Sequence, residues 1–466
     1  MTTTSTFMGL QTALRGILAQ QRALDTTAHN IANANTVGYT RQEAVLAPTR
    51  PYTEPAVSRP PQAGQIGTGV DVVEFRRIRD EFIDVQLRAQ TMRKGYAEAR
   101  RDGLEQVELT LNEPSDSGIG ALMSRYWATW QDVSNTPEDI ATRQALVQNG
   151  SALGDGIRTL ESQLSTIESQ TGQNVVLTIN EINSIASDVR NLNDSIRRSL
   201  IVGDQPNDLL DQRDVQLDRL GALGAVITSD GDGDGALTVT LNGVTLVDDL
   251  TAYTVSETAG NLENVALVES VSLAGKTGKL AGLVELRDTT IPSYRAQLDA
   301  IASELITQTN SRHAAGFDLT GAAGGIFFTG TGAADIDVSA ALIGSPSLVA
   351  ASGNGQPGNA DNALALAALR TTPLAGLGGA SIQDAYSQLV TTIGSDAREA
   401  ERTLDNSTIL SDGLEGRRQS VSGVSLDEEM AGLVRFQRAY QASARALSAM
   451  DEMIDILVNR TGRVGL

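Results

Sequence analysis

Apolar residues recur at alternating intervals of three and four at both ends of this chain, and this repeat constrains the fold more than any other feature. Such spacing places the apolar side chains along one face of a helix, as in a coiled coil. Near the start, the positions are Leu10, Leu14, Ile17, Gln21, Leu24, Ala28 and Ile31. Near the end, they are Leu426, Leu433, Tyr440, Leu447 and Ile454, with Phe436, Met450 and Leu457 in a companion series. We therefore predict a helix at each terminus, with residues 1–44 pairing with residues 420–466.

An amide-rich segment is predicted to end the first helix. Asn30, Asn33, Asn35 and Gly38 precede Tyr39, and Asn and Gly tolerate left-handed backbone and favour turns. Prolines at positions 48, 51, 55, 60 and 61 follow. Residues 45–72 are therefore interpreted as an extended linker that ends in a short strand.

The middle of the chain predicts a helical rod made of residues 73–224, 281–315 and 360–419. Its clearest heptad series runs through Val175, Ile182, Val189 and Ile196. A further long helix is expected from position 80 to about position 111, with an apolar seam at Phe82, Val85, Leu87 and Leu104.

The pattern changes to alternation at residues 237–247, around the dipeptide Asn242-Gly243. This is a strong hairpin signal and predicts a β-rich insert at residues 225–280. The Gly-rich, irregular residues 316–359 are grouped with it as an outer domain. The expected fold class is mainly α with a β insert: coiled-coil-like terminal helices that pair, a central helical bundle domain and a small β-rich outer domain.

Composition excludes several kinds of function. The formal charge of −21 argues against nucleic acid and against an anionic membrane surface as partners, because both are bound by concentrated Lys and Arg. No stretch reaches the 18 apolar residues of a membrane span. The chain has no cysteine and two histidines, His29 and His313, for which capping or interface roles are expected. No catalytic residue, cofactor or metal site is predicted, and an enzyme is not expected.

Two charged segments have alternative interpretations. Residues 230–235 alternate Asp and Gly like the first half of a calcium loop, but Leu241 stands where the loop needs a bidentate Glu. A solvated turn is the preferred interpretation, and a calcium-responsive module stays open. Eight Arg and Lys residues lie between positions 76 and 101, with four acids among them and a fifth, Asp102, directly after them, which favours a charged helix face.

Several segments resemble bacterial flagellar axial proteins. Residues 24–41 are similar to the rod and hook protein signature, and residues 422–429 and 436–445 resemble the C-terminal axial motif. Residues 67–70, 80–88, 278–294, 310–319 and 327–328 resemble the hook-associated protein 1 family of hook–filament junction proteins, the FlgK type. The resemblance spans most of the chain but assigns neither residues 225–280 nor residues 330–358.

The resemblance implies a structural protein that polymerises through its terminal helices. It implies secretion by the flagellar type III export system, an extracellular location in the flagellum, and contacts with copies of itself, with hook protein and with a second hook–filament junction protein. An export chaperone is expected on the C-terminal helix. The assembly interface would use the two apolar repeats with Asn30, Asn33, Asn35, Gly38 and Tyr39. The alternatives are a rod or hook structural protein, and a surface adhesin or carbohydrate-binding module on a helical stalk.

Overall fold

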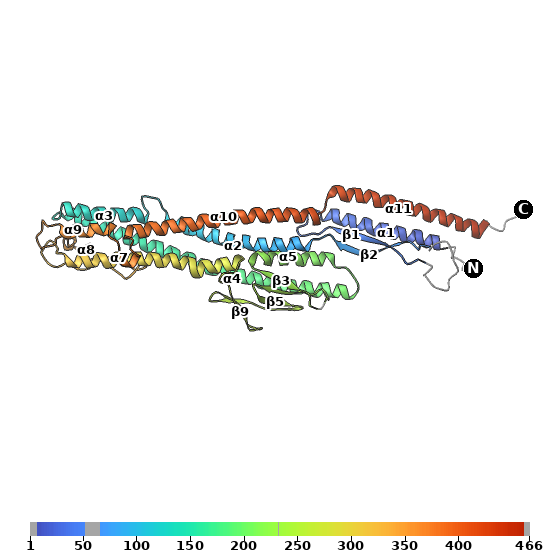
Figure 1. The fold of residues 1–466 in the computed structure, drawn as a ribbon, viewed down its shortest axis with the longest axis horizontal. Helices are drawn as coiled ribbons and strands as arrows, with labels where there is room; N and C mark the ends of the chain where they lie inside the picture. The colour runs from blue at the N-terminus through green and yellow to red at the C-terminus, as the bar shows by residue number, and fades with distance from the viewer. Residues whose placement is uncertain (1–6, 52–65, 232, 461–466) are drawn as a thin grey trace.

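A computed structural model describes residues 7–51, 66–231 and 233–460. The described chain forms a long rod, and its first and last helices lie together at one end of the molecule (Figure 1). The helices are α1 (Met8–Ala32), α2 (Glu81–Leu111), α3 (Ile119–Asn135), α4 (Ile140–Ile201), α5 (Asn207–Leu223), α6 (Lys279–Glu285), α7 (Ile291–Ala315), α8 (Ala340–Gly344), α9 (Asp361–Ala367), α10 (Ile382–Ser422) and α11 (Leu426–Asp455). Short π-helical turns, η1 (Leu286–Thr290) and η5 (Ile456–Arg460), continue α6 and α11, and 3-10 turns are η2 (Pro346–Leu348), η3 (Ala368–Thr371) and η4 (Ala375–Leu377).

The strands form small antiparallel sheets. They are β1 (Gln42–Pro48), β2 (Val70–Arg77), β3 (Val226–Ser229), β4 (Thr238–Leu241), β5 (Val244–Asp248), β6 (Thr251–Ala252), β7 (Ser256–Thr258), β8 (Asn261–Asn264), β9 (Glu269–Ser272), β10 (Phe328–Thr329) and β11 (Asp337–Val338). Their orders are β1-β2, β3-β4-β5-β6, β7-β8-β9 and β10-β11. No helix of the described ranges combines the length and apolar character needed to cross a membrane.

The predicted pairing of the two ends is confirmed, because α1 lies along α11 at one end of the rod (Figure 1). The linker prediction is wrong in part. Residues 42–48 and 70–77 form the β1-β2 hairpin, which packs on α1, with a register shift between Val45 and Leu46. Only Pro48 falls inside a strand, and β1 is an edge strand of a two-stranded sheet, where a missing N–H is tolerated. The other predicted linker prolines, apart from Pro51, lie outside the described residues.

The start of α2 was predicted correctly, but its seam was not. Asp80 caps the helix by accepting hydrogen bonds from the backbone N–H groups of Phe82 and Ile83. Leu87 and Leu104 are buried, whereas the side chains of Phe82 and Val85 are exposed. The buried face of this helix combines large apolar residues with small ones, so the predicted seam marks only part of the core-facing side; the small residues are Gly95, Ala97, Ala99 and Gly103.

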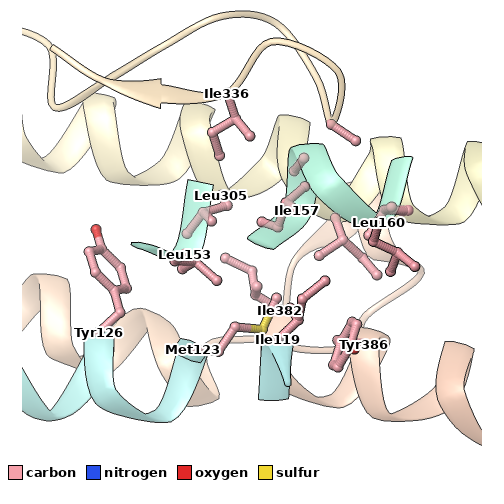
Figure 2. Packing of buried hydrophobic residues seen from close by; sticks show 14 of the residues in the cluster. Ile119, Met123, Tyr126, Leu153, Ile157, Leu160, Leu305, Ile336, Ile382 and Tyr386 are labelled. Atoms are coloured by element: carbon pink, nitrogen blue, oxygen red, sulfur yellow. The ribbon is translucent and has the colours of Figure 1, made fainter. Parts of the chain in front are cut away.

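Two apolar cores hold the rod, and α4, which has 62 residues, crosses both. One core lies at the end of the rod away from α1 and α11, and we call it the distal core. Figure 2 shows how Met123 of α3, Ile157 of α4 and Ile382 of α10 converge in it. The second core joins the other half of α4 to α5, α6 and the β insert. The predicted series on α4 is confirmed, because Val175, Ile182, Val189 and Ile196 are all buried.

The β insert is confirmed, but its predicted grouping with residues 316–359 is wrong. Asn242 and Gly243 have φ values of 52° and 94°, as a two-residue type I′ hairpin requires, and Leu241 pairs with Val244 across the turn. Residues 316–359 instead belong to the distal core, into which they place Phe327 and Phe328. The many glycines of this segment suggested an exposed, irregular region, although Phe327 and Phe328 are buried in the core.

His313 fixes this irregular segment to α7. Its ring is buried, and its Nδ1 lies 2.7 Å from the carbonyl oxygen of Gly325, while the backbone N–H of Ala350 donates to Nε2 over 2.9 Å. Since Nε2 accepts, the neutral ring must donate from Nδ1. Burial lowers the pKa of this imidazole, so it stays neutral and holds two loop positions together.

The close packing of α2 generates a stability prediction. A Cβ at Gly95 would lie 2.2 Å from the carbonyl oxygen of Ala222, so Gly95→Ala forces α2 away from the end of α5. We expect the free energy of unfolding to fall by about 1–3 kcal/mol, measured by denaturant titration. The control is Gly394→Ala on α10, where a Cβ meets nothing within 4 Å and a gain of up to about 1 kcal/mol is expected. Equal effects of the two substitutions would contradict the packing described here.

Candidate assembly interface

Small residues on α1 allow α11 to approach closely. The side chains of Ala13, Ala19 and Ala23 are buried. A Cβ at Gly9 would lie 2.7 Å from Sδ of Met450, and one at Gly16 would lie 3.1 Å from Oγ of Ser443. These two pairs also show that the helices run antiparallel. The contact between the two terminal helices is therefore made by the small residues of α1, which no apolar repeat marks.

The predicted apolar positions flank this contact, and none of them is fully buried. Those that are half-buried are Leu10, Ile17, Leu24, Ile31, Leu433, Phe436, Leu447, Met450 and Ile454. Those that are exposed are Leu14, Leu426, Tyr440 and Leu457. Leu18, Met430, Val434 and Met453, which the sequence interpretation did not single out, are exposed as well. The described part of α11 buries a single side chain, that of Glu429. The axial pair, meaning α1 with α11, thus presents apolar side chains to solvent along much of its length.

Asn30 connects the two helices of the axial pair to each other, to β1 and to the loop that follows α1. Its side chain is buried, and its Nδ2 donates to the carbonyl oxygen of Gln42 at 2.9 Å and to Oε2 of Glu429 at 3.1 Å. Its Oδ1 accepts from the hydroxyl of Tyr39 at 2.7 Å and from the backbone N–H of Gln42 at 3.0 Å. Every hydrogen-bonding position of the amide is used. Asn30 therefore ties the end of α1 to β1, to the following loop and to the start of α11.

Arg41 completes the link to α11. Its Nε donates to Oε1 of Glu429 at 2.7 Å, and its guanidinium also reaches Oε2 of Glu428 at 3.0 Å. The backbone N–H of Arg41 donates to the carbonyl oxygen of Ser422 at the end of α10. Glu429 is buried, and a buried carboxylate is tolerated when it is paired and hydrogen-bonded, as it is here. We call Asn30, Tyr39, Arg41 and Glu429 the polar node.

The remaining amide and glycine positions of the segment have unequal roles. Gly38 has a φ of +78°, and a Cβ there would lie 2.1 Å from Cγ2 of Val215 on α5, so both conformation and space require glycine. Burial, followed by the charges of Asp208 and other acids, raises the pKa of Tyr39. Asn33 donates to the carbonyl oxygen of His29, whereas Asn35 is exposed and its side chain forms no hydrogen bond with another described residue.

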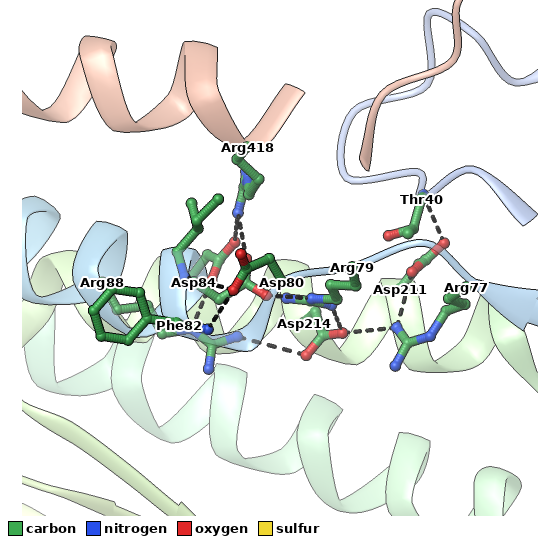
Figure 3. A network of polar contacts seen from close by, with 12 residues as sticks. Thr40, Arg77, Arg79, Asp80, Phe82, Asp84, Arg88, Asp211, Asp214 and Arg418 are labelled. Carbon is green, nitrogen blue, oxygen red and sulfur yellow. Dashed lines mark hydrogen bonds and ion pairs between the residues drawn. The ribbon is translucent and has the colours of Figure 1, made fainter. Parts of the chain in front are cut away.

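An arginine–aspartate network fixes the polar node to the rod (Figure 3). Arg77 at the end of β2 lies 2.9 Å from both Asp211 and Asp214 of α5. Arg79 bonds to Asp214 and also to Asp84 of α2. The second carboxylate oxygen of Asp211 accepts from the backbone N–H of Thr40 at 2.9 Å. These bonds hold together the β1-β2 hairpin, the loop between α1 and β1, and α5.

The same network continues onto α2 and α10. Asp218 of α5 accepts from Arg88 at 2.7 Å and from Arg418 of α10 at 2.6 Å. Burial by itself lowers the pKa of Arg418, but its hydrogen bond with Asp218 and the charge of Glu415 outweigh this and raise it. These paired charges span the point where the axial pair joins the rod.

The expectation of a charged helix face for the basic stretch is wrong for Arg77, Arg79 and Arg88, which are mostly buried in this network. Their partners come from α5, where Asp208, Asp211, Asp214 and Asp218 recur at intervals of three and four. That spacing puts the acids on one helix face. This spacing is the sequence signal that identifies the partners of the three arginines on α5.

The Asp-Gly segment lies at a turn of the insert. The backbone N–H of Gly233 donates to Oδ1 of Asp230 at 2.7 Å, and Asp234 pairs with Arg197 at 3.1 Å. Residue 232 lies outside the described residues. Within the described part of the chain, no group of three or more His, Asp or Glu side chains is arranged to hold a metal ion.

Comparisons with known proteins agree with this division of the chain. Residues 104–328 match the family described as "Flagellar hook-associated protein FlgK helical domain". Residues 10–40 match "Flagella basal body rod protein", and residues 417–460 match "Flagellar basal body rod FlgEFG protein C-terminal". The two rod-protein matches therefore fall on the axial pair, whereas the first match falls on the rod and the insert.

Two curated relatives match over nearly their whole length. Flagellar hook-associated protein 1 of Bacillus subtilis (strain 168) is 34% identical over 504 residues, covering 98% of this chain and 99% of the relative. The protein of the same name from Escherichia coli (strain K12) is 27% identical over 553 residues, covering 97% and 99%. The structure of the flagellar hook junction protein FlgK from Burkholderia pseudomallei aligns with a TM-score of 0.65 at 17% identity, covering 72% of this chain and 100% of that one, which shows a shared fold.

The polar node generates a prediction for Asn30→Ala. The substitution leaves Gln42 and Tyr39 without a partner and removes one of the two partners of the buried Glu429 carboxylate. We expect the opening free energy of α11 to fall by about 1–3 kcal/mol, measured by hydrogen exchange of amides at residues 426–440. The matched control is Asn35→Ala in the same segment, which should leave exchange within about 0.5 kcal/mol of the unchanged protein. Indistinguishable exchange in the two variants would show that the node does not hold α11.

Proposed function

Because the chain belongs to the flagellar hook-associated protein 1 family, we propose that it is a structural subunit of the hook–filament junction that polymerises through its terminal helices. The observation that carries this proposal is the axial pair, in which none of the predicted apolar positions is fully buried. Exposed apolar surface of this extent marks an interaction site in soluble proteins. Neighbouring axial molecules would cover it.

Different families match the ends and the middle of the chain, and this favours a junction protein over a rod or hook protein. The ends match rod-protein families, as expected for any axial protein, but residues 104–328 match a helical domain described for FlgK. That stretch contains most of the distal core and the whole β insert. No described feature of the insert favours an adhesin or a carbohydrate-binding module.

The proposed partners are copies of this chain, hook protein on one side and a second hook–filament junction protein on the other. We place it outside the cell, after export by the flagellar type III system. Before export, a chaperone would cover the apolar side chains of α11, including Leu426, Met430 and Val434, which are exposed when α11 has only α1 beside it. The proposed role is structural, without catalysis or a cofactor.

Leu14→Asp tests this role. Leu14 is 44% exposed on α1, so a carboxylate there is solvated in the isolated chain but must be desolvated at a subunit contact, which costs several kcal/mol. We expect an unchanged melting temperature of the purified chain and motility reduced to that of a strain lacking the protein. Leu433→Asp and Leu447→Asp should also abolish assembly while leaving the rod folded.

The matched control is Leu109→Asp on α2, where an exposed leucine lies on the rod away from the axial pair. It should leave filament attachment and swimming unchanged. Normal junctions containing the Leu14→Asp chain would contradict the proposed placement of the axial pair.

A further inference from the structure

The hairpin formed by β8 and β9 ends in an apolar turn. Residues 265–268 read Val-Ala-Leu-Val, and all four are exposed, Val268 to 91%. Turns usually consist of Gly, Asn, Asp or Ser, and Val268 has a φ of +56°, which a β-branched residue rarely adopts. The opposite end of the hairpin lies on the rod, because a Cβ at Gly260 would be 3.3 Å from Asp288. Residues 265–268, which we call the insert turn, therefore project away from the helices.

Side-chain hydrogen bonds hold the insert turn in place. Oδ1 of the buried Asn264 accepts from the backbone N–H of Leu267 at 3.2 Å, and its Nδ2 donates to the carbonyl oxygen of Thr245 at 2.7 Å. On the other side of the turn, Glu269 accepts from the backbone N–H and the hydroxyl of Thr245 at 2.6 Å and 2.9 Å. Both ends of the turn are thus fastened to β5. Such a turn is pre-organised for binding, because it has little conformational freedom left to lose.

A second exposed apolar surface lies along the helix pair of α2 and α10. We call it the flank strip, and its members are Phe82 and Arg93 of α2 with Leu410, Arg417 and Val421 of α10. All five side chains are exposed, Phe82 to 69%. Neither arginine of the strip forms an ion pair with another described residue. The strip therefore combines apolar surface with positive charge that has no acidic partner in the described chain.

Helix geometry places these five side chains on one side of the pair. The helices are antiparallel, since Gln90 donates to the carbonyl oxygen of Ser407 at 3.4 Å and Asp84 lies 3.9 Å from Arg418. The strip residues of α2 lie about 60–80° from Gln90 around the helix, and those of α10 about 40–80° from Ser407 in the same rotational sense. In an antiparallel pair, similar rotations from the contact point to the same side. The acids within these two segments point in other directions.

The insert turn and the flank strip are complementary in charge and both are apolar. Residues 225–280 carry eight Asp and Glu against two Lys, and Glu263, close to the turn, forms no ion pair with another described residue. An apolar turn on an acidic insert thus matches an apolar strip with two arginines. A single chain keeps the two apart, because the insert packs on α4, α5 and α6. Arg88, which binds α5, lies about 120–140° around α2 from the strip.

We propose that the flank strip receives the insert turn of a neighbouring copy of this chain. This rests on the proposed function, which places identical copies around one axis. Copies related in this way meet through two different surfaces, and the turn and the strip are such a pair. The insert and the start of α2 both lie in the half of the rod next to the axial pair (Figure 1), so lateral neighbours can bring them together. The contact is small and is made by side chains, so it adds to the contacts of the terminal helices.

Cross-linking in assembled flagella tests the contact, and it is specific because the chain contains no cysteine. Val268→Cys with Leu410→Cys, in cells without the native copy, should give multimers with a short bis-maleimide reagent. Either single variant should stay monomeric, because the turn meets the strip and neither meets its own equivalent. The control pair, Val268→Cys with Leu109→Cys, uses an exposed leucine of α2 outside the strip and should give no multimers. Multimers from a single variant, or none from the first pair, would overturn the inference.

A double-mutant cycle tests whether the two surfaces act on each other. Val265→Ala with Val268→Ala truncates the turn, and Phe82→Ala truncates the strip. These side chains are exposed, so each purified variant should melt like the unchanged protein. In flagella, each should lower the temperature at which filaments detach, and the combined variant should lower it by less than the sum, because contacting residues are not additive.

The other outcomes of the cycle contradict the inference. Unchanged detachment in either variant would overturn it, and so would fully additive effects, because the strip would then face a different protein. Failure of the proposed function is distinguishable from these results, since the unchanged chain would then be absent from isolated junctions.

Discussion

The buried carboxylate of Glu429 is the interaction on which the arrangement of the termini depends. It is the one side chain that the described part of α11 buries, and Arg41 and Asn30 bind its two oxygens over 2.7 Å and 3.1 Å. An unpaired charge at this depth would cost several kcal/mol, so the helix cannot rotate or slide without losing these bonds. Polar contacts at one end therefore set the register of α11, and its apolar side chains are left available for other contacts.

The arginine–aspartate network transmits this register to the rod. Asp211 and Asp214 of α5 bind Arg77 at the end of β2, and Asp211 also accepts from the backbone N–H of Thr40. Asp218 of α5 binds arginines of α2 and α10. Beyond this junction, α4 runs through two apolar cores and keeps the rod straight (Figure 1). Tight apolar packing makes the rod rigid, whereas the axial pair depends on directional polar bonds. This difference suits a subunit whose rod buries its apolar side chains within one chain, whereas the apolar side chains of its axial pair would be buried by neighbouring molecules.

Sequence reasoning predicted the elements whose signal is local. The Asn242-Gly243 turn, the heptad series through Val175 and the pairing of the two terminal helices are all present. It failed where small residues form the contact, as on α1 and on α2 around Gly95, because an apolar repeat then marks a different face. It also missed the partners of Arg77 and Arg79 on α5, since these aspartates lie more than 130 positions away in the chain.

Hydrogen exchange along the whole chain, compared between the purified monomer and isolated assembled flagella, tests the central claim most directly. The account predicts that amides of the rod exchange alike in both states. It also predicts that amides of α1 and α11 exchange at least about tenfold more slowly in the assembly, which corresponds to about 1.4 kcal/mol of added protection. Equal protection of α1 and α11 in the two states would show that the axial pair is complete in a single chain, and would contradict the account.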